Sequence, residues 1–187
     1  NSNTLGLVPP DRFIPIAEEI GFIIELGKYI FKQACYDFLV FTKSCSTLKT
    51  ISINVSAVQF QQKTFVDSLV EITNEVGIAP KLITLEITES YLMKNIKNNM
   101  NTLNQLKKLG FGISIDDFGT GHSSMSYLKQ FPIDELKIDK SFVDDIVDDQ
   151  SDTDITNAII ALSQSLNYVN VAEGIETIEQ EEFLSKT

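Results

Sequence analysis

The sequence predicts an α/β fold built around a parallel β-sheet. Five short runs of apolar and β-branched residues are typical of buried strands, and segments of helical periodicity lie between them. The strands follow one another at intervals of about 20 to 36 residues, which is the spacing of βαβ units. Polar residues come directly after each run, as they do at the functional edge of such a sheet.

The expected elements follow in a simple order along the chain. A proline-containing loop leads into a short helix that ends near Gly21, with Asp11 as its expected N-cap. A longer helix over residues 25–43 carries a core-facing apolar stripe that includes Phe31 and Phe38. We expect strands at residues 50–53, 82–85, 111–115, 136–139 and 168–172. Helical periodicity marks residues 65–76, 96–109, 123–131, 155–166 and 178–184.

The length of the chain leaves two architectures open. A complete eight-stranded barrel takes about 250 residues, whereas this chain has 187 residues. The chain therefore forms either a smaller α/β sheet or part of a longer barrel. It begins at Asn1 without a methionine and stops just after the last expected helix, so we expect both ends to be cut.

Composition disfavours several classes of function. The net charge of −11 and the pI of about 4.5 argue against a DNA-binding surface, which needs a basic face. Charges interrupt every apolar stretch, so neither a signal peptide nor a transmembrane span is predicted. Cys35 and Cys45 form no metal-binding pair and no disulfide framework. We expect a cytoplasmic domain, and a membrane anchor elsewhere in the parent protein stays open.

Two adjacent carboxylates, Asp116 and Asp117, follow the apolar run 111–115 and precede a glycine-containing loop. Two charges at the mouth of a buried strand are costly unless a cation lies beside them. Taken alone, the pair could be a helix cap and a turn residue. However, the carboxyl ends of all strands in an α/β barrel point to one face. We therefore expect a cluster of Asn54, Glu86, Asp116, Asp117, Lys137, Asp139 and Glu173.

The residue types in this cluster indicate a site for hard cations. Carboxylate and amide oxygens select Mg²⁺ or Mn²⁺. Glu86, Asp116, Asp117 and Glu173 together carry about the negative charge that two divalent ions neutralise. An aspartate can bridge two such ions, an arrangement that suits in-line attack on a phosphodiester.

Two residues of this region keep alternative interpretations. Lys137 lies inside an apolar strand and forms either a structural ion pair, with Asp139 or another acid, or a contact that positions or deprotonates a water. Glu176 follows Glu173 by three residues, so both can face the same side at the start of a helix. Glu176 is then either a capping acid or a residue just outside the metal ligands.

Six stretches resemble the EAL-domain cyclic di-GMP phosphodiesterases of bacteria. They are FIPIAEE (13–19), SINVSAVQF (52–60), LEITES (85–90), DDFGTGHSS (116–124), LKIDKSF (136–142) and AEGIET (172–177). The matches run through nearly the whole chain in the order of the family. The resemblance implies a modified TIM-type (β/α)₈ barrel whose first strand is antiparallel to its neighbour. It also implies hydrolysis of one phosphodiester bond of cyclic di-GMP to linear pGpG, in bacterial second-messenger signalling.

The resemblance also implies a role for each residue of the cluster. Asn54, Glu86 and Asp116 would bind one metal, and Asp116, Asp117 and Glu173 would bind or orient the second. Lys137 would hold the attacking water.

Three further residues would support this site. Glu89 would brace the loop 117–127, which in the family links the metal site to a homodimer interface. Glu176 and Asp139 would lie just outside the ligands. Sensory or GGDEF-type domains are the expected partners in the parent protein.

Two departures from the family pattern bear on these expectations. His122, the only histidine, stands where the family usually has tyrosine, and we expect little effect because both are ring side chains. The Glu-Ala-Leu tripeptide that names the family, with its metal-binding glutamate, is expected before Asn1, and the last two strands after Thr187. We therefore expect residues 1–187 to be a single EAL-type barrel domain truncated at both ends, without its first strand and its C-terminal strands.

Two other functions compete with the phosphodiesterase. A cyclic di-GMP receptor that keeps the fold and has lost catalysis is the main alternative. A barrel enzyme that abstracts a proton with Lys137 beside a magnesium triad, as enolase-like enzymes do, is the other. The adjacent aspartates and Asn54 favour two metals, which argues against this proton-abstracting enzyme.

Overall fold

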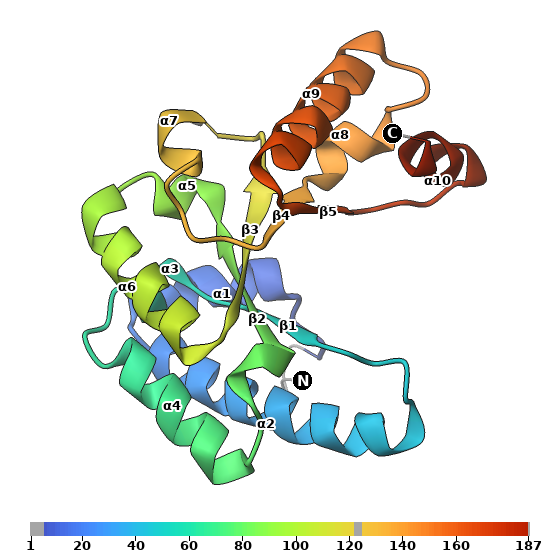
Figure 1. Ribbon diagram of the computed structural model, residues 1–187. Helices are drawn as coiled ribbons and strands as arrows, with labels where there is room; N and C mark the ends of the chain where they lie inside the picture. Colours follow the sequence, from blue (N-terminus) through green and yellow to red (C-terminus); the bar gives the residue numbers. More distant parts are fainter. Residues whose placement is uncertain (1–5, 122–124, 187) are drawn as a thin grey trace.

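The five predicted strands form one parallel sheet (Figure 1). The computed structural model describes residues 6–121 and 125–186. Every neighbouring pair of strands is parallel, and the spatial order β1-β2-β3-β4-β5 is the order of the sequence. The strands are β1 (Ile51–Asn54), β2 (Ile83–Thr88), β3 (Gly112–Phe118), β4 (Glu135–Ile138) and β5 (Val169–Ala172). The prediction of a parallel α/β fold is therefore confirmed.

Helices precede β1, lie between successive strands and follow β5. The longer ones are α1 (Pro10–Glu19), α2 (Ile23–Ser44), α4 (Phe65–Val76), α6 (Ile96–Leu109), α9 (Gln150–Leu166) and α10 (Ile178–Ser185). The short ones are α3 (Ala57–Phe60), α5 (Glu89–Leu92), α7 (Met125–Leu128), α8 (Lys140–Asp144) and the 3₁₀ turn η1 (Pro80–Leu82). None of the helices in the described ranges is long and apolar enough to cross a membrane.

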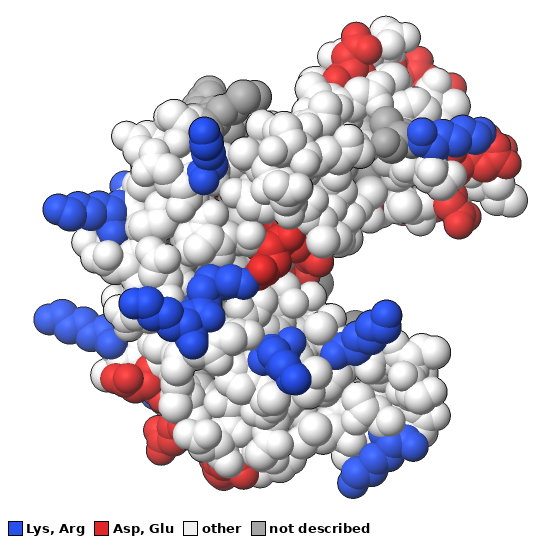
Figure 2. Space-filling view, in the orientation of Figure 1, with Lys and Arg blue, Asp and Glu red and all other residues white. Residues whose placement is uncertain are grey.

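The strand order identifies the sheet as an arc of a barrel. Crossovers between parallel strands are almost always right-handed, so an order that never reverses places all crossover helices on one face of the sheet. Such a sheet curls into a barrel, whereas doubly wound sheets reverse their order and carry helices on both faces. Figure 2 shows the resulting hollow between the edge strands β1 and β5, with acidic side chains at its base.

The helix-facing side of the sheet forms the core. Alternate residues of a strand point to opposite faces, and on the helix side these are almost all branched aliphatic residues. They pack against buried side chains of the helices, such as Phe31 and Leu103. The fully buried members on the strands include Ile83, Leu85, Ile87, Ile113, Ile115 and Leu136. This apolar layer leaves the opposite, concave face to the polar residues.

Three local predictions differ from the structure. Asp11 is not the N-cap of α1, since the cap is Pro9 and Pro10 begins the helix without needing a hydrogen bond for its nitrogen. Helix α9 begins at Gln150 rather than at 155 because the Asp149 side chain accepts hydrogen bonds from the first helical N–H groups. In the predicted helix 123–131, helix is described only over Met125–Leu128.

Asp134 fixes the start of β4 against β3. Its carboxylate accepts a hydrogen bond from Ile113 N at 2.8 Å and pairs with Lys107 at 2.6 Å, while its own N–H donates to Ile113 O. These contacts lie at the amino ends of the strands, the edge of a barrel that serves stability rather than chemistry.

We expect Asp134→Ala to lower the free energy of unfolding by about 1–3 kcal/mol, because the buried N–H of Ile113 loses its partner. Urea unfolding of the complete protein measures this. The matched variant Lys107→Ala removes only a half-exposed ion pair, so it should cost less than about 1 kcal/mol. Equal losses in both variants would mean that the ion pair, and not the hydrogen bond to Ile113, stabilises this corner.

Candidate functional site

Strand register brings the predicted ligands on the first three strands to one face. Asn54 at the end of β1 pairs with Glu86, and Glu86 pairs with Ser114 on β3. Asp116 comes two residues after Ser114, so its side chain leaves the sheet on the same face as that of Glu86. Asn54 is exposed because β1 is an edge of the sheet, whereas Glu86 and Asp116 are buried.

The same reasoning places the residues of β4 and β5. Ser114 pairs with Glu135, and Lys137 follows Glu135 by two residues. Lys137 pairs with Val171, and Glu173 follows Val171 by two residues. Side chains from all five strands therefore point to the concave face near the carboxyl ends of the strands, where active sites of barrels are found.

Asp117 departs from this alternation. In a regular strand its side chain would point away from that of Asp116. Its backbone instead adopts a left-handed conformation with φ of 55°, and the register of β3 against β4 shifts between Ile115 and Phe118. Such irregularities re-aim side chains beside active sites. As a result, carboxylate oxygens of Asp116, Asp117 and Glu173 all lie within 4.8 Å of one another.

Lys137 lies at the centre of the cluster. Its ammonium group is 3.0 Å from Glu86, 2.9 Å from Asp116 and 2.5 Å from Glu173. The Lys137 side chain is only 9% exposed. The sequence left open whether Lys137 pairs with Asp139 or with another acid. The acids that pair with it are Glu86, Asp116 and Glu173.

The cluster shifts the pKa values of two of its members. Burial by itself lowers the pKa of Lys137, but hydrogen bonds to Glu173, Asp116 and Glu86 outweigh it and hold the pKa above its usual value. Burial raises the pKa of Asp117, and the nearby charge of Asp116 raises it further. Lys137 is therefore a cation at neutral pH.

The donor set suits divalent cations. The four carboxylates Glu86, Asp116, Asp117 and Glu173 carry four negative charges, of which Lys137 balances one. The three charges that remain, at distances of a few ångströms, repel one another unless further positive charge is bound. Oxygen atoms of carboxylates, with the amide of Asn54 at the rim, are the ligands of Mg²⁺ and Mn²⁺.

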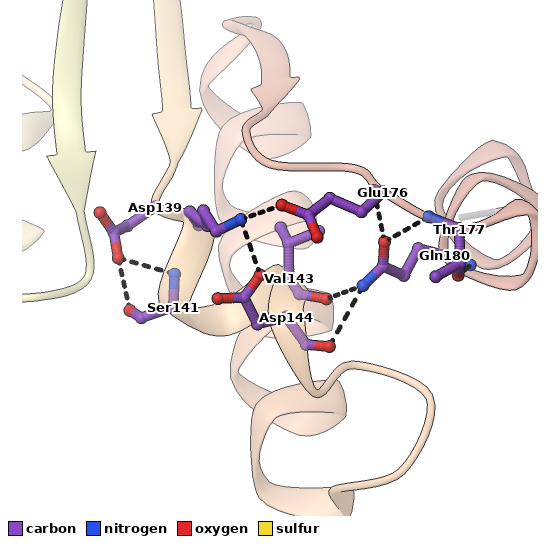
Figure 3. A network of polar contacts seen from close by, with 8 residues as sticks. Asp139, Ser141, Val143, Asp144, Glu176, Thr177 and Gln180 are labelled. Atoms are coloured by element: carbon purple, nitrogen blue, oxygen red, sulfur yellow. Dashed lines mark hydrogen bonds and ion pairs between the residues drawn. The ribbon is translucent and has the colours of Figure 1, made fainter.

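The other residues predicted for the site lie around this cluster. Glu89 is fully buried, and its carboxylate accepts a hydrogen bond from Gly119 N at 2.9 Å, in the loop that follows Asp117. Asp139 caps α8 by accepting a hydrogen bond from Ser141 N (Figure 3). His122 lies outside the described residues.

The side chain of Glu176 makes its contact with α8. Its side chain is exposed and pairs with Lys140 on α8 (Figure 3), and this contact lowers the pKa of the Glu176 carboxyl group. The N-cap of α10 is Thr177, whose side chain accepts a hydrogen bond from Gln180 N. The Glu176 carboxylate is therefore not the cap of this helix.

One residue near the site was not predicted from the sequence. Gln180 is 6% exposed and makes hydrogen bonds both to the loop after β5 and to the end of α8. The sequence does contain a signal for part of this role. Thr177 and Gln180 have the spacing of a capping box, in which the glutamine side chain accepts a hydrogen bond from the backbone N–H of the N-cap residue.

Comparison with known proteins identifies the family. The sequence model of a protein family, the EAL domain, matches residues 1–187. The chain belongs to the EAL domain family. The resemblance read from the six motifs is thereby confirmed.

Relatives of this EAL domain are long signalling proteins. The chain is 45% identical over 178 residues to the signalling protein YkoW of Bacillus subtilis, covering 95% of the chain and 22% of YkoW. It is 40% identical over 181 residues to MucR of Pseudomonas aeruginosa, named a bifunctional diguanylate cyclase/cyclic di-GMP phosphodiesterase, covering 97% of the chain and 26% of MucR. The EAL domain described here thus spans about a quarter of the length of these relatives.

Solved structures confirm the barrel fold. A structure of the MucR phosphodiesterase in complex with cyclic di-GMP superposes with a TM-score of 0.94 at 39% identity, over 99% of the chain and 75% of that structure. A manganese and cyclic di-GMP complex of BlrP1 from Klebsiella pneumoniae superposes with a TM-score of 0.80 at 27% identity, over 96% of the chain and 45% of BlrP1. The five-stranded sheet is accordingly part of a TIM-like barrel.

Proposed function

We propose that the protein hydrolyses one phosphodiester bond of cyclic di-GMP to linear pGpG with two divalent cations, Mg²⁺ or Mn²⁺, in its site. The observation that carries this proposal is the convergence of four carboxylates, an amide and a lysine on one face of the sheet. The names of the relatives, which include cyclic di-GMP phosphodiesterases, support the choice of substrate.

The proposed ligands divide between two ions. Asn54, Glu86 and Asp116 would hold one, and Asp116, Asp117 and Glu173 the other. When bound, the ions supply positive charge that lowers the pKa of a water and stabilises the charge of the reacting phosphate.

Electrostatics explains why the site needs such ions. Cyclic di-GMP carries a negative charge on each of its two phosphodiesters, and a cluster with three uncompensated carboxylates repels it. Two divalent ions reverse the sign, since four positive charges exceed the three negative ones left after Lys137 is counted. The substrate is then attracted to the same place that repels it in the absence of metal.

Lys137 acts in this proposal as a donor and not as a base. Its raised pKa keeps the ammonium protonated at neutral pH, so it can donate hydrogen bonds to the attacking water or to a phosphate oxygen. Burial makes this charge more effective than it would be in water. The contacts with Glu86, Asp116 and Glu173 fix the position of the ammonium before substrate arrives.

We also propose that the domain works inside a larger signalling protein. Sensory or GGDEF-type domains in the parent would control it, and the loop after Asp117, which Glu89 holds through Gly119, would connect the site to a homodimer interface. The small share of the relatives that this chain covers supports the presence of further domains in them.

The test uses the complete protein that contains this chain. With cyclic di-GMP and Mg²⁺ we expect linear pGpG, identified by liquid chromatography and mass spectrometry, and no turnover after chelation of the metal with EDTA. Cyclic AMP and cyclic GMP serve as substrate controls. Tight binding of cyclic di-GMP without turnover, over a range of Mg²⁺ and Mn²⁺ concentrations, would contradict the proposal and favour the non-catalytic receptor.

A further inference from the structure

Gln180 joins two segments that follow neighbouring strands (Figure 3). Its side-chain oxygen accepts hydrogen bonds from Glu176 N at 2.7 Å and Thr177 N at 3.0 Å, in the loop after β5. Its side-chain nitrogen donates to Val143 O and Asp144 O, both at 3.1 Å, at the end of α8. Helix α8 in turn follows β4, the strand that carries Lys137.

The amide of Gln180 is used to its full capacity. A glutamine side chain has two N–H donors and one oxygen with two lone pairs, and all four positions have a partner. The side chain is buried, so water does not replace these partners if the side chain moves. A buried polar group with every hydrogen bond made specifies one arrangement of the segments around it.

The arrangement that it specifies includes Glu173. At the end of β5, Glu173 N donates to Ile138 O at 3.1 Å, the last backbone contact between β4 and β5. Gly174 then turns the chain with φ of 71°, and a Cβ at this glycine would overlap the side chain of Lys140. Glu176 comes two residues after Gly174, and its backbone N–H donates to the side chain of Gln180. The carboxylate-bearing residue is therefore anchored on both sides.

Glu173 needs this support more than the other acids around Lys137. Its side chain is 34% exposed, whereas those of Glu86 and Asp116 are 9% and 12% exposed. The two buried carboxylates lie on strands with a neighbouring strand on each side, whereas Glu173 comes directly after β5, where the loop begins. The position of its carboxylate depends on the loop that follows it.

We propose that Gln180 is a positioning residue that sets the place of Glu173 in the metal site by tying the loop after β5 to α8. Gln180 itself contacts none of the clustered carboxylates and acts only through the backbone. The inference rests on the proposed function insofar as Glu173 is taken as a metal ligand.

Two variants of the complete protein break the contact between the loop and α8 in different ways. Gln180→Glu keeps an acceptor for the N–H groups of Glu176 and Thr177 but sets a carboxylate against the carbonyls of α8. Gln180→Met has similar length and loses all four hydrogen bonds. Gln33→Ala, which removes an exposed glutamine on α2, is the matched control.

The readout is the affinity for Mn²⁺ alone, measured by isothermal titration calorimetry without substrate. We expect both Gln180 variants to bind Mn²⁺ about 10- to 100-fold more weakly, the usual effect of losing support behind a metal ligand. Turnover of cyclic di-GMP at saturating Mn²⁺ should return close to that of the parent, and Gln33→Ala should match the parent throughout. Unchanged Mn²⁺ affinity in a folded Gln180 variant would overturn the proposal.

Two further outcomes are informative. If circular dichroism shows that both variants are unfolded, Gln180 is a structural residue and the positioning role is wrong. If the parent binds Mn²⁺ but does not hydrolyse cyclic di-GMP, the proposed function fails while the effect of Gln180 on Mn²⁺ affinity is still measured, so the two failures are distinct.

Discussion

Replacing Asp117 with asparagine in the complete protein should reduce Mg²⁺-dependent hydrolysis of cyclic di-GMP by roughly 10²-fold or more, the scale of losing one charged group that stabilises the reacting phosphate. The substitution keeps the size of the side chain and removes one negative charge from the group that Asp117 forms with Asp116 and Glu173. The change is selective, because the ion pairs of Lys137 involve Glu86, Asp116 and Glu173 and remain intact.

The dependence on Mg²⁺ identifies the cause. If Asp117 is a ligand, the variant should need a higher Mg²⁺ concentration for half of its maximal rate, and excess Mg²⁺ should restore part of the activity. Asp37→Asn on α2, an exposed site whose side chain accepts a hydrogen bond from Gln33, is the control and should behave as the parent. Near-normal turnover of the Asp117 variant at Mg²⁺ just sufficient for the parent would contradict the two-metal assignment.

The period of two along a strand made most of the site predictable. The sequence predicts Asn54, Glu86, Asp116 and Glu173 because each follows an apolar run, and Lys137 because it lies inside one. Because the strands are parallel and in sequential order, alternation places these side chains on the same face of the sheet. The apolar alternation on the other face fixes the register, since a slip by one residue would bury the charges against the helices.

Features that depend on irregular backbone or on distant partners were not predictable. Asp117 was predicted for the cluster as the neighbour of Asp116, but strand alternation would place its side chain on the opposite face, and the sequence does not predict the left-handed backbone that re-aims it. The partners of Lys137 lie on β2, β3 and the end of β5, so they follow from sheet order and not from spacing along the chain. Gln180 shows the same limit, because its capping pattern is local while its bonds to α8 are long-range.

The second large effect is expected at Lys137. Lys137→Met keeps most of the aliphatic stem and removes the charge, and it should lower kcat by roughly 10²-fold or more, with binding of cyclic di-GMP retained. Excess Mg²⁺ should not restore the rate, which separates this variant from Asp117→Asn. A variant that lost binding of cyclic di-GMP and kept its rate at saturation would show that Lys137 is a substrate ligand.

The thermal stability of a Lys137 variant, with and without Mg²⁺, provides an independent test of the role of this lysine. Without metal, Lys137 is the cation that pairs with Glu86, Asp116 and Glu173, and leaving buried charges without their partner costs about 3–5 kcal/mol. We therefore expect the Tm of Lys137→Met to fall in EDTA and to recover largely in Mg²⁺, since bound divalent ions supply the missing positive charge. Lys32→Met, which breaks an exposed pair with Glu75, should show neither change. If Mg²⁺ did not raise the Tm of the Lys137 variant more than that of the parent, the lysine and the metals would not be neutralising the same carboxylates.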